Sequence, residues 1–310
     1  MPKPVHQLTA AQFDAMFPVG DEDACKAYLK ARRWPDGVHC PRCGNPKVYD
    51  LKSRKWHWQC EQCSKDGYRF SIIAGTIFEN TNKPLRDWFK VAHLMLTAKK
   101  GMSSRQIGRY MGFGSVKTAW LMGHKIRTAL MERDTDKLGG IVEVDETFVG
   151  GKYKNKHRKL RRAHGDGNTH KFNTGAIASG KIPVAGAVSR KGNVVARVIA
   201  NAKAETICAF VRETVSHKVS LLCTDDFQGY KRLDAEYPRQ SVDHTYGEYV
   251  VGAVHTNTIE GFWSIFKRGI VGSFHKVSAK YLPLYVAEFQ FRYNNRMNDD
   301  IFGAAISGAC

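Results

Sequence analysis

The arrangement of the cysteines constrains the fold of this chain most strongly. Four of them form two short pairs separated by residues 44–59: Cys40, Cys43, Cys60 and Cys63. Two such pairs at this spacing can close one tetrahedral tetrathiolate site for zinc. The intervening segment has strand-like aromatic and β-branched residues, so the sequence predicts a zinc ribbon with one structural zinc ion. Two disulfides are the alternative, but we find no secretion signal, and disulfides are typical of exported proteins.

A helical pattern precedes the cysteine pairs. Thr9 and Gln12 resemble a capping box at the start of segment 8–34, whose apolar residues suit amphipathic helices. We therefore expect residues 1–80 to form a helical cap and the zinc ribbon.

Helical patterns also follow the ribbon, over residues 84–98, 105–112 and 116–130. A short glycine-containing turn separates the last two, which is typical of a helix-turn-helix. Lys117 lies early in the second of these helices, where a recognition helix contacts bases or phosphates. A plain helical hairpin that only packs the domains together is the alternative. Residues 81–138 are thus expected to form a helix-turn-helix-like segment that binds DNA.

The pattern changes from helix to strand near Gly139-Gly140, where we place the main domain boundary. The segment 141–151 is rich in β-branched residues, and Asp145 lies inside it. A carboxylate in such a strand is costly unless it binds a metal or another cation. Glu143 shares a face with Asp145 by alternation, and Glu146 is adjacent, but we choose neither as a ligand.

Basic residues dominate the next segment, 152–171. The whole chain has 48 Lys and Arg against 29 Asp and Glu, a formal net charge of +19. This surplus favours a polyanionic partner, first of all nucleic acid, and no apolar run is long enough to span a membrane. Because the segment leaves the strand of Asp145 directly, we expect a loop that binds phosphates, although solvated charge is the ordinary alternative. The expected DNA-binding residues here are Lys152, Lys154, Lys156, Arg158, Lys159, Arg161 and Arg162.

The segments after residue 180 predict a mixed sheet. Two strands joined by a turn at Lys191-Gly192 are followed by a helix, a strand ending in Asp225 and Asp226, a short helix or turn, a brief strand and two helices. Strand hairpins followed by alternating strands and helices give a mixed sheet flanked by helices. We therefore expect a mixed α/β (α+β) protein with an RNase H-like catalytic domain over 139–300.

The segment VHTNTIEGFWSIFKRG, residues 254–269, resembles the start of an amphipathic helix. Glu260 and Lys267 are seven positions apart, and seven steps of about 100° return to nearly the same side of a helix. We expect Thr256 or Asn257 to cap this helix, with a capping-box role as the alternative for Glu260 alone. One apolar face carries Ile259, Trp263, Phe266 and Ile270.

From about residue 20 to 300, the chain resembles bacterial insertion-sequence transposases of the ISXO type. The resemblance rests on the motifs CPRC…CEQC, VDETFVGG, LCTDDFQGY, HTNTIEGFWSIFKRG and EFQFRYNNR. That family has a zinc ribbon ahead of a DDE catalytic domain. The resemblance implies that Asp145, Asp225 and Glu260 bind divalent metal and that Lys267 is the basic residue of the site. Asp226 is the alternative to Asp225, which occupies the family's TD position.

The chemistry implied by the resemblance is the cutting and joining of DNA. Two Mg²⁺ (or Mn²⁺) ions about 3.5–4 Å apart can activate the attacking oxygen and stabilise the leaving oxygen. Magnesium prefers oxygen ligands and retains several waters, so two or three carboxylates suffice. Lys267 is expected to hold a phosphate near the metals, and Arg268 to contact DNA.

We therefore expect a DNA transposase that cleaves insertion-element ends and joins the 3′-hydroxyl to target DNA. Its expected partners are double-stranded DNA, at the terminal inverted repeats and the target, and further copies of itself assembled on DNA. No membrane partner is expected, and the expected location is the bacterial cytoplasm, at the nucleoid. Two alternatives remain: a metal-dependent nuclease that does not join strands, and a catalytically silent, sequence-specific DNA-binding regulator.

Overall fold

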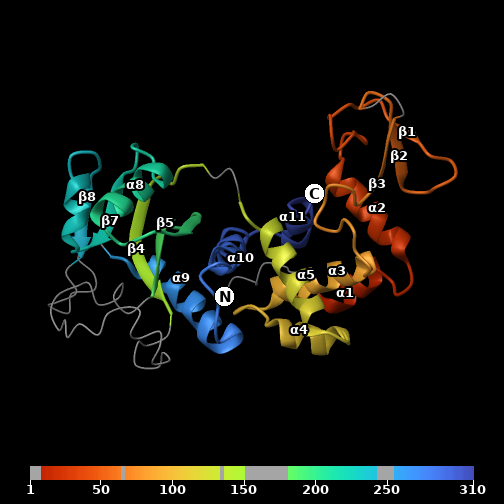
Figure 1. Ribbon diagram of the computed structural model, residues 1–310. Helices are drawn as coiled ribbons and strands as arrows, with labels where there is room; N and C mark the ends of the chain where they lie inside the picture. The colour runs from red at the N-terminus through yellow and green to blue at the C-terminus, as the bar shows by residue number, and fades with distance from the viewer. Residues whose placement is uncertain (1–7, 64–66, 133–135, 151–180, 243–254) are drawn as a thin grey trace, which may run out of the picture. The chain divides into compact units, whose positions relative to one another are not determined.

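The computed structural model describes residues 8–63, 67–132, 136–150, 181–242 and 255–310 (Figure 1). Packing divides the chain into two units, Met1–Met131 together with Asn295–Cys310, and Glu132–Asn294. The second unit contains most of the segment 139–300 that was expected to be catalytic, whereas the residues after Asn294 belong to the first unit. Within the described residues, no helix is long and apolar enough to cross a membrane.

The first unit begins with helices α1 (Ala10–Met16) and α2 (Glu22–Arg33). The predicted capping box is confirmed, because the Thr9 side chain accepts from the Gln12 N–H and the Gln12 side chain accepts from the Thr9 N–H. At the start of α2, the Asp21 side chain accepts a hydrogen bond of 2.9 Å from the Ala24 N–H.

A small antiparallel sheet follows, formed by β1 (Tyr49–Asp50), β2 (His57–Cys60) and β3 (Tyr68–Ser71) in the order β1-β2-β3. This is the hairpin predicted between the cysteine pairs. Its inner face is aromatic, with the rings of Trp34 and Trp58 5.4 Å apart and both in contact with Phe70.

Three helices come next: α3 (Leu85–Thr97), α4 (Ser104–Met111) and α5 (Val116–Ala129). The predicted helix, glycine turn and second helix are all present. Helix α4 ends at Gly112, whose φ of 66° is left-handed, a conformation that glycine adopts without a steric penalty. The Ser115 side chain then accepts a hydrogen bond at the start of α5.

The last helix of the chain, α11 (Ile301–Ser307), completes the first unit. Phe302 is buried, and its ring centroid lies 5.8–6.0 Å from the centroids of Phe13, Phe17, Tyr28 and Phe89. Asp300 caps α11 and also pairs with Arg32 of α2. Local sequence patterns do not reveal the role of this helix, because its partners lie almost the whole chain away.

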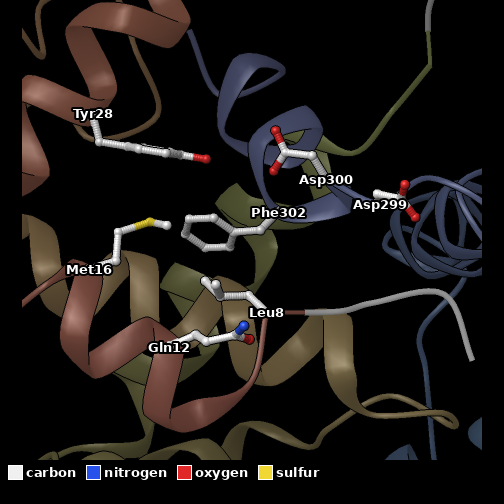
Figure 2. Close-up of a pocket in the computed structure, with 7 residues that line it drawn as sticks. All are labelled: Leu8, Gln12, Met16, Tyr28, Asp299, Asp300 and Phe302. Carbon is white, nitrogen blue, oxygen red and sulfur yellow. The ribbon is translucent and has the colours of Figure 1, made fainter.

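A cavity of about 170 Å³ lies beside Phe302, between α1, α2 and the start of α11 (Figure 2). None of the predicted site residues lines it. Its lining residues are Leu8, Gln12, Met16, Tyr28, Asp299, Asp300 and Phe302.

The second unit is built on a five-stranded sheet of order β6-β5-β4-β7-β8. Pairing is antiparallel between β6, β5 and β4, and parallel between β4, β7 and β8. This mixed order with helices on both faces is the expected RNase H-like arrangement. The strands are β4 (Ile141–Val149), β5 (Ile182–Ser189), β6 (Val194–Val198), β7 (Leu221–Asp225) and β8 (Arg239–Val242).

Helices cover both faces of this sheet (Figure 1). One face packs against α8 (Ala204–Thr214) and the 3₁₀ turn η2 (Gln228–Leu233). The other packs against α9 (Asn257–Arg268) and α10 (Leu282–Asn294). Alternation along β4 therefore sends odd-numbered side chains towards α9 and even-numbered ones towards α8. The predicted apolar face of α9 is confirmed as buried at Ile259, Trp263, Phe266 and Ile270.

Candidate functional site

The parallel pairing of β4 with β7 brings Asp145 level with Asp225. The last pair in the register is Glu143 with Cys223, and the same offset continued for two residues sets Asp145 beside Asp225. Neighbouring strands are about 4.8 Å apart, so two side chains on one face at this level are close. Asp225 is the final residue of β7, whereas Asp226 lies beyond the strand and is exposed. The geometry therefore favours Asp225 over Asp226.

A glycine in β5 lets α9 approach the sheet next to Asp145. Gly186 pairs directly with Asp145 across the strands. A Cβ atom at Gly186 would lie only 2.5 Å from Cζ2 of Trp263 and 3.2 Å from Cδ1 of Ile259. Glycine is therefore needed for this close packing, which seats the first turns of α9 over β5. Glu260 follows Ile259 in α9, so the packing of this helix on β5 also determines the position of the Glu260 carboxylate.

Glu143 holds the first turn of α9 against β4. Its side chain is wholly buried. Oε2 accepts hydrogen bonds from the backbone N–H groups of Thr258 at 2.7 Å and Ile259 at 3.0 Å, and Oε1 accepts from the Thr258 hydroxyl at 2.8 Å. A carboxylate at this position satisfies N–H groups that lack partners within the helix and interacts favourably with the helix dipole.

The predicted N-cap position is confirmed, but the capping hydrogen bonds do not come from the residue at that position. Thr256 does occupy the N-cap position before Asn257, but its side chain makes no capping hydrogen bond. Instead, the Thr256 hydroxyl donates to Oε1 of Glu260 at 2.8 Å. The cap comes from Glu143, more than one hundred positions earlier in the chain, and local sequence rules do not reach that far.

Arg190 provides the cation that the buried Glu143 needs. Its Nε donates to Glu143 Oε1 at 2.7 Å, and a second guanidinium nitrogen donates to the His255 carbonyl at 2.9 Å. His255 Nδ1 also lies 3.2 Å from Glu143 Oε1. Sequence reasoning missed this supporting role, although one signal pointed to it. Two acids alternating on one face of an apolar strand each require a cation or several N–H donors.

The four predicted catalytic residues act on one another electrostatically. The pKa of Asp145 is raised to about 7, chiefly by burial and then by the Asp225 carboxylate. A hydrogen bond of 2.8 Å from the Glu146 N–H lowers the pKa of Asp145, and smaller effects come from Glu260, which raises it, and Lys267, which lowers it. The structure thus brings these side chains together, while their catalytic roles stay a prediction.

Glu146 points to the opposite face of the sheet. Its Oε2 accepts a hydrogen bond of 2.7 Å from the hydroxyl of Tyr230, a fully buried residue of η2. Burial raises the pKa of Glu146 to about 7, and the charges of Asp225 and Asp145 contribute in the same direction. Glu146 is therefore near the site, but Tyr230 holds its side chain on the opposite face of the sheet. This position agrees with the choice not to predict it as a ligand.

The carboxylates match the donor chemistry of magnesium. Hard divalent cations prefer carboxylate oxygens, and a group of like charges is stabilised by a cation among them. Within the described residues, only the four cysteines form a tight group of three or more His, Cys, Asp or Glu ligand atoms, all within 4.8 Å of one another. Asp145, Asp225 and Glu260 do not form such a group among the described residues, so their role as magnesium ligands stays a prediction.

The four predicted zinc ligands converge on one point. The sulfurs of Cys40 and Cys63 are 3.4 Å apart, those of Cys43 and Cys60 are 3.7 Å apart, and all four thiols are free. A tetrahedral zinc ion with bonds of about 2.3 Å separates its sulfurs by about 3.8 Å. The arrangement therefore fits one structural zinc ion, and the sulfurs are too far apart for disulfides.

We expect removal of zinc to unfold the ribbon and leave the second unit folded. Zinc supplies much of the folding free energy of such small sheets, whereas the second unit has its own core. In hydrogen exchange on the full chain, a chelator should abolish protection in β2 and β3 and leave β4 and β5 protected. Retained protection in β2 would contradict a structural role for the metal, and re-added zinc serves as the control.

We expect the metal-free second unit to lose stability as pH rises from about 4 to about 7. Asp145 and Glu146 have pKa values raised from 3.8 and 4.5 in unstructured peptides to about 7 each. Their contribution to stability is thus complete at low pH and lost once both ionise in the folded state. Exchange protection of β4 should be higher at pH 5.5 than at pH 8, after correction for intrinsic exchange rates. The double variant Asp145→Asn, Glu146→Gln is the control, and an equal pH effect in it would contradict this assignment.

The predicted DNA-binding residues divide between described and undescribed parts of the chain. Lys117 is exposed in the first turn of α5, and Lys267 and Arg268 are exposed at the end of α9. The basic segment 152–171 lies outside the described residues, and so do Lys152, Lys154, Lys156, Arg158, Lys159, Arg161 and Arg162.

Comparison with known proteins agrees with both parts of this description. The family of ISXO2-like transposase domains matches residues 137–294, and the family of transposase zinc-ribbon domains matches residues 20–66. One relative, described as an uncharacterized protein in transposable element ISH50 of Halobacterium salinarum, is 30% identical over 267 residues. The alignment covers 84% of this chain and 86% of the relative. The first match contains all the predicted catalytic residues, and the second contains all four paired cysteines.

Proposed function

This chain belongs to the family of ISXO2-like transposases, and from that premise we propose that it cleaves insertion-element ends and joins the freed 3′-hydroxyl to target DNA. The observation that carries the proposal is the meeting of three elements at one place. Strand β4 sets Asp145 level with Asp225 of β7, and Gly186 seats α9 beside Asp145.

In the proposed site, Asp145, Asp225 and Glu260 hold two Mg²⁺ (or Mn²⁺) ions. When bound, the ions supply charge for the attacking and leaving oxygens of a displacement at phosphorus. Asp145 contributes from the middle of the sheet, where burial opposes ionisation of its carboxyl and a neighbouring cation favours it. The Thr256 hydroxyl donates to Glu260 and so orients that carboxylate.

Cations on the same helix complete the proposed site. Lys267 lies two turns after Glu260 and is exposed, so its ammonium can hold a phosphate as a point charge. Arg268, which follows it, donates to the Ser264 carbonyl at 3.1 Å and keeps other N–H groups for DNA. In this proposal the basic segment 152–171 binds the backbone of the same DNA.

The parts of the chain outside the catalytic segment are assigned to DNA recognition in this proposal. Residues 1–80 and 81–138 recognise double-stranded DNA at the terminal repeats, with Lys117 at the start of the recognition helix. The protein acts as a homo-oligomer assembled on DNA, in the cytoplasm at the nucleoid. The catalytic segment is 139–300, of which residues 295–300 pack with the first unit.

A strand-transfer assay tests the proposal. Labelled DNA carrying the element ends is incubated with the full chain, Mg²⁺ and an unlabelled target plasmid. We expect nicked ends and covalent end–target products. Nicking without joined products would favour a nuclease, and binding without nicking would favour a silent regulator. Reactions with Ca²⁺ in place of Mg²⁺ provide the control for assembly without chemistry.

A further inference from the structure

The zinc ribbon carries a hollow lined mainly by basic and polar side chains. Its volume is about 560 Å³, and it lies between β3, the loop that joins β1 to β2, and the turns after β3. Four of its lining residues are basic, Arg42, Arg54, His57 and Arg69, and one is acidic, Glu79. The basic side chains come from three separate segments of the chain. This lining therefore suits an extended anion that carries several charged groups.

Two of the arginines are oriented before any ligand arrives. The guanidinium carbon of Arg42 lies 3.8 Å from the centre of the Tyr68 ring, so the planar group is stacked on an aromatic face. The Nε of Arg69 donates to Gln59 Oε1 at 3.1 Å. These contacts use only part of each guanidinium, which leaves N–H groups available. Such preorganised forks match the oxygens of a phosphate in pairs.

Arg54 has no such restraint: within the described residues, its side chain donates no hydrogen bond to another group. It is exposed in the loop between β1 and β2. On the acidic side, Glu79 accepts from the Gly75 N–H at 3.1 Å. Glu79 is the one acid among the described lining residues, so this lining has a surplus of positive charge.

We propose that this hollow binds the sugar–phosphate backbone of double-stranded DNA, with Arg42, Arg54 and Arg69 each contacting a phosphate. The inference rests on the proposed DNA partner and assigns it a surface on the ribbon that is separate from the carboxylate site. Contacts of this kind position a protein on DNA and do not read its sequence. These three contacts therefore contribute affinity and orientation and do not themselves distinguish one DNA sequence from another.

The test measures DNA affinity of the full chain, without Mg²⁺, over a series of salt concentrations. Each phosphate contact contributes a slope of about 0.9 to the fall of log K with log salt, so replacing all three arginines should reduce the slope by about 2.7. We expect the triple variant Arg42→Gln, Arg54→Gln, Arg69→Gln to bind roughly tenfold or more weakly at moderate salt, for element-end and unrelated DNA alike. The variant Glu79→Gln should bind more tightly than the natural chain, because it removes the opposing charge.

A matched control carries Lys47→Gln, Lys52→Gln and Lys100→Gln, three exposed lysines outside the hollow, with the same change in net charge. An equal loss of affinity and slope in both triple variants would mean general electrostatics and overturn the proposal. An unchanged slope in the arginine variant would also overturn it. Zinc content is measured for every protein, because Arg42 lies between two zinc ligands. If Arg42→Gln lowers the zinc content, the double variant Arg54→Gln, Arg69→Gln and the Glu79→Gln variant decide in its place.

This experiment separates failure of the inference from failure of the proposed function. It measures binding alone in the absence of Mg²⁺, whereas the proposed function is tested by nicking and joining. DNA breakage with an unchanged salt slope would overturn only the ribbon assignment. A changed slope without any breakage would overturn only the proposed chemistry.

Discussion

Replacement of Asp145 by Asn is expected to reduce Mg²⁺-dependent cleavage of element ends about 10³-fold or more, with DNA affinity retained. A metal bound by this carboxylate supplies several kcal/mol of transition-state stabilisation, and each 1.36 kcal/mol corresponds to a factor of ten in rate. The amide has nearly the same shape but carries no charge. Single-turnover cleavage with DNA bound in advance measures the chemical step alone.

The same substitution should stabilise the metal-free protein at pH 8. Burial raises the pKa of Asp145 to about 7, so its ionised form is disfavoured in the folded chain at this pH, and a neutral amide removes that cost. A gain in stability together with a loss of cleavage would show that the Asp145 carboxylate serves the reaction and not the fold. Asp226→Asn is the matched control, since Asp226 is the exposed neighbour of Asp225. An equal loss of cleavage in both variants would remove the support for this assignment.

Replacement of Glu143 by Ala is expected to destabilise the docking of α9 by about 3–5 kcal/mol, the usual effect of breaking a buried ion pair. The variant removes the acceptor for the N–H groups of Thr258 and Ile259 and leaves the Arg190 guanidinium without this carboxylate. Amide exchange at Thr258 and Ile259 should become fast while the first unit is unaffected. Cleavage should also fall, because the helix that carries Glu260 is no longer held to β4.

Glu205→Ala provides the comparison for this prediction. Glu205 pairs with Arg232 on the surface, where solvent screening leaves an ion pair with little effect on stability. If Glu143→Ala changes exchange in α9 no more than Glu205→Ala does, the capping role of Glu143 is wrong. Glu143→Gln should fall between the two, because the amide retains one acceptor oxygen but loses the charge that Arg190 pairs with.

The sequence was informative wherever the relevant interaction is local. Period and spacing predicted the cysteine site, the helical segments and the apolar face of α9, because each depends on residues a few positions apart. Asp145 was also found early, since an acid inside a β-branched strand is conspicuous by its cost, whereas the roles of Asp225 and Glu260 were implied by the family resemblance. The same reasoning undervalued Glu143, whose partners are distant in the chain.

By itself, therefore, the sequence identified the candidate side chains for the chemistry and most of the segments that form helices and strands. Only the tertiary structure decided what places them together. Gly186 matters because of a tryptophan on a helix from another part of the chain, and α11 completes the first unit from the far end of the sequence. Helix and strand signals act over a few residues, whereas close packing and the pairing of buried charge depend on which distant segments meet.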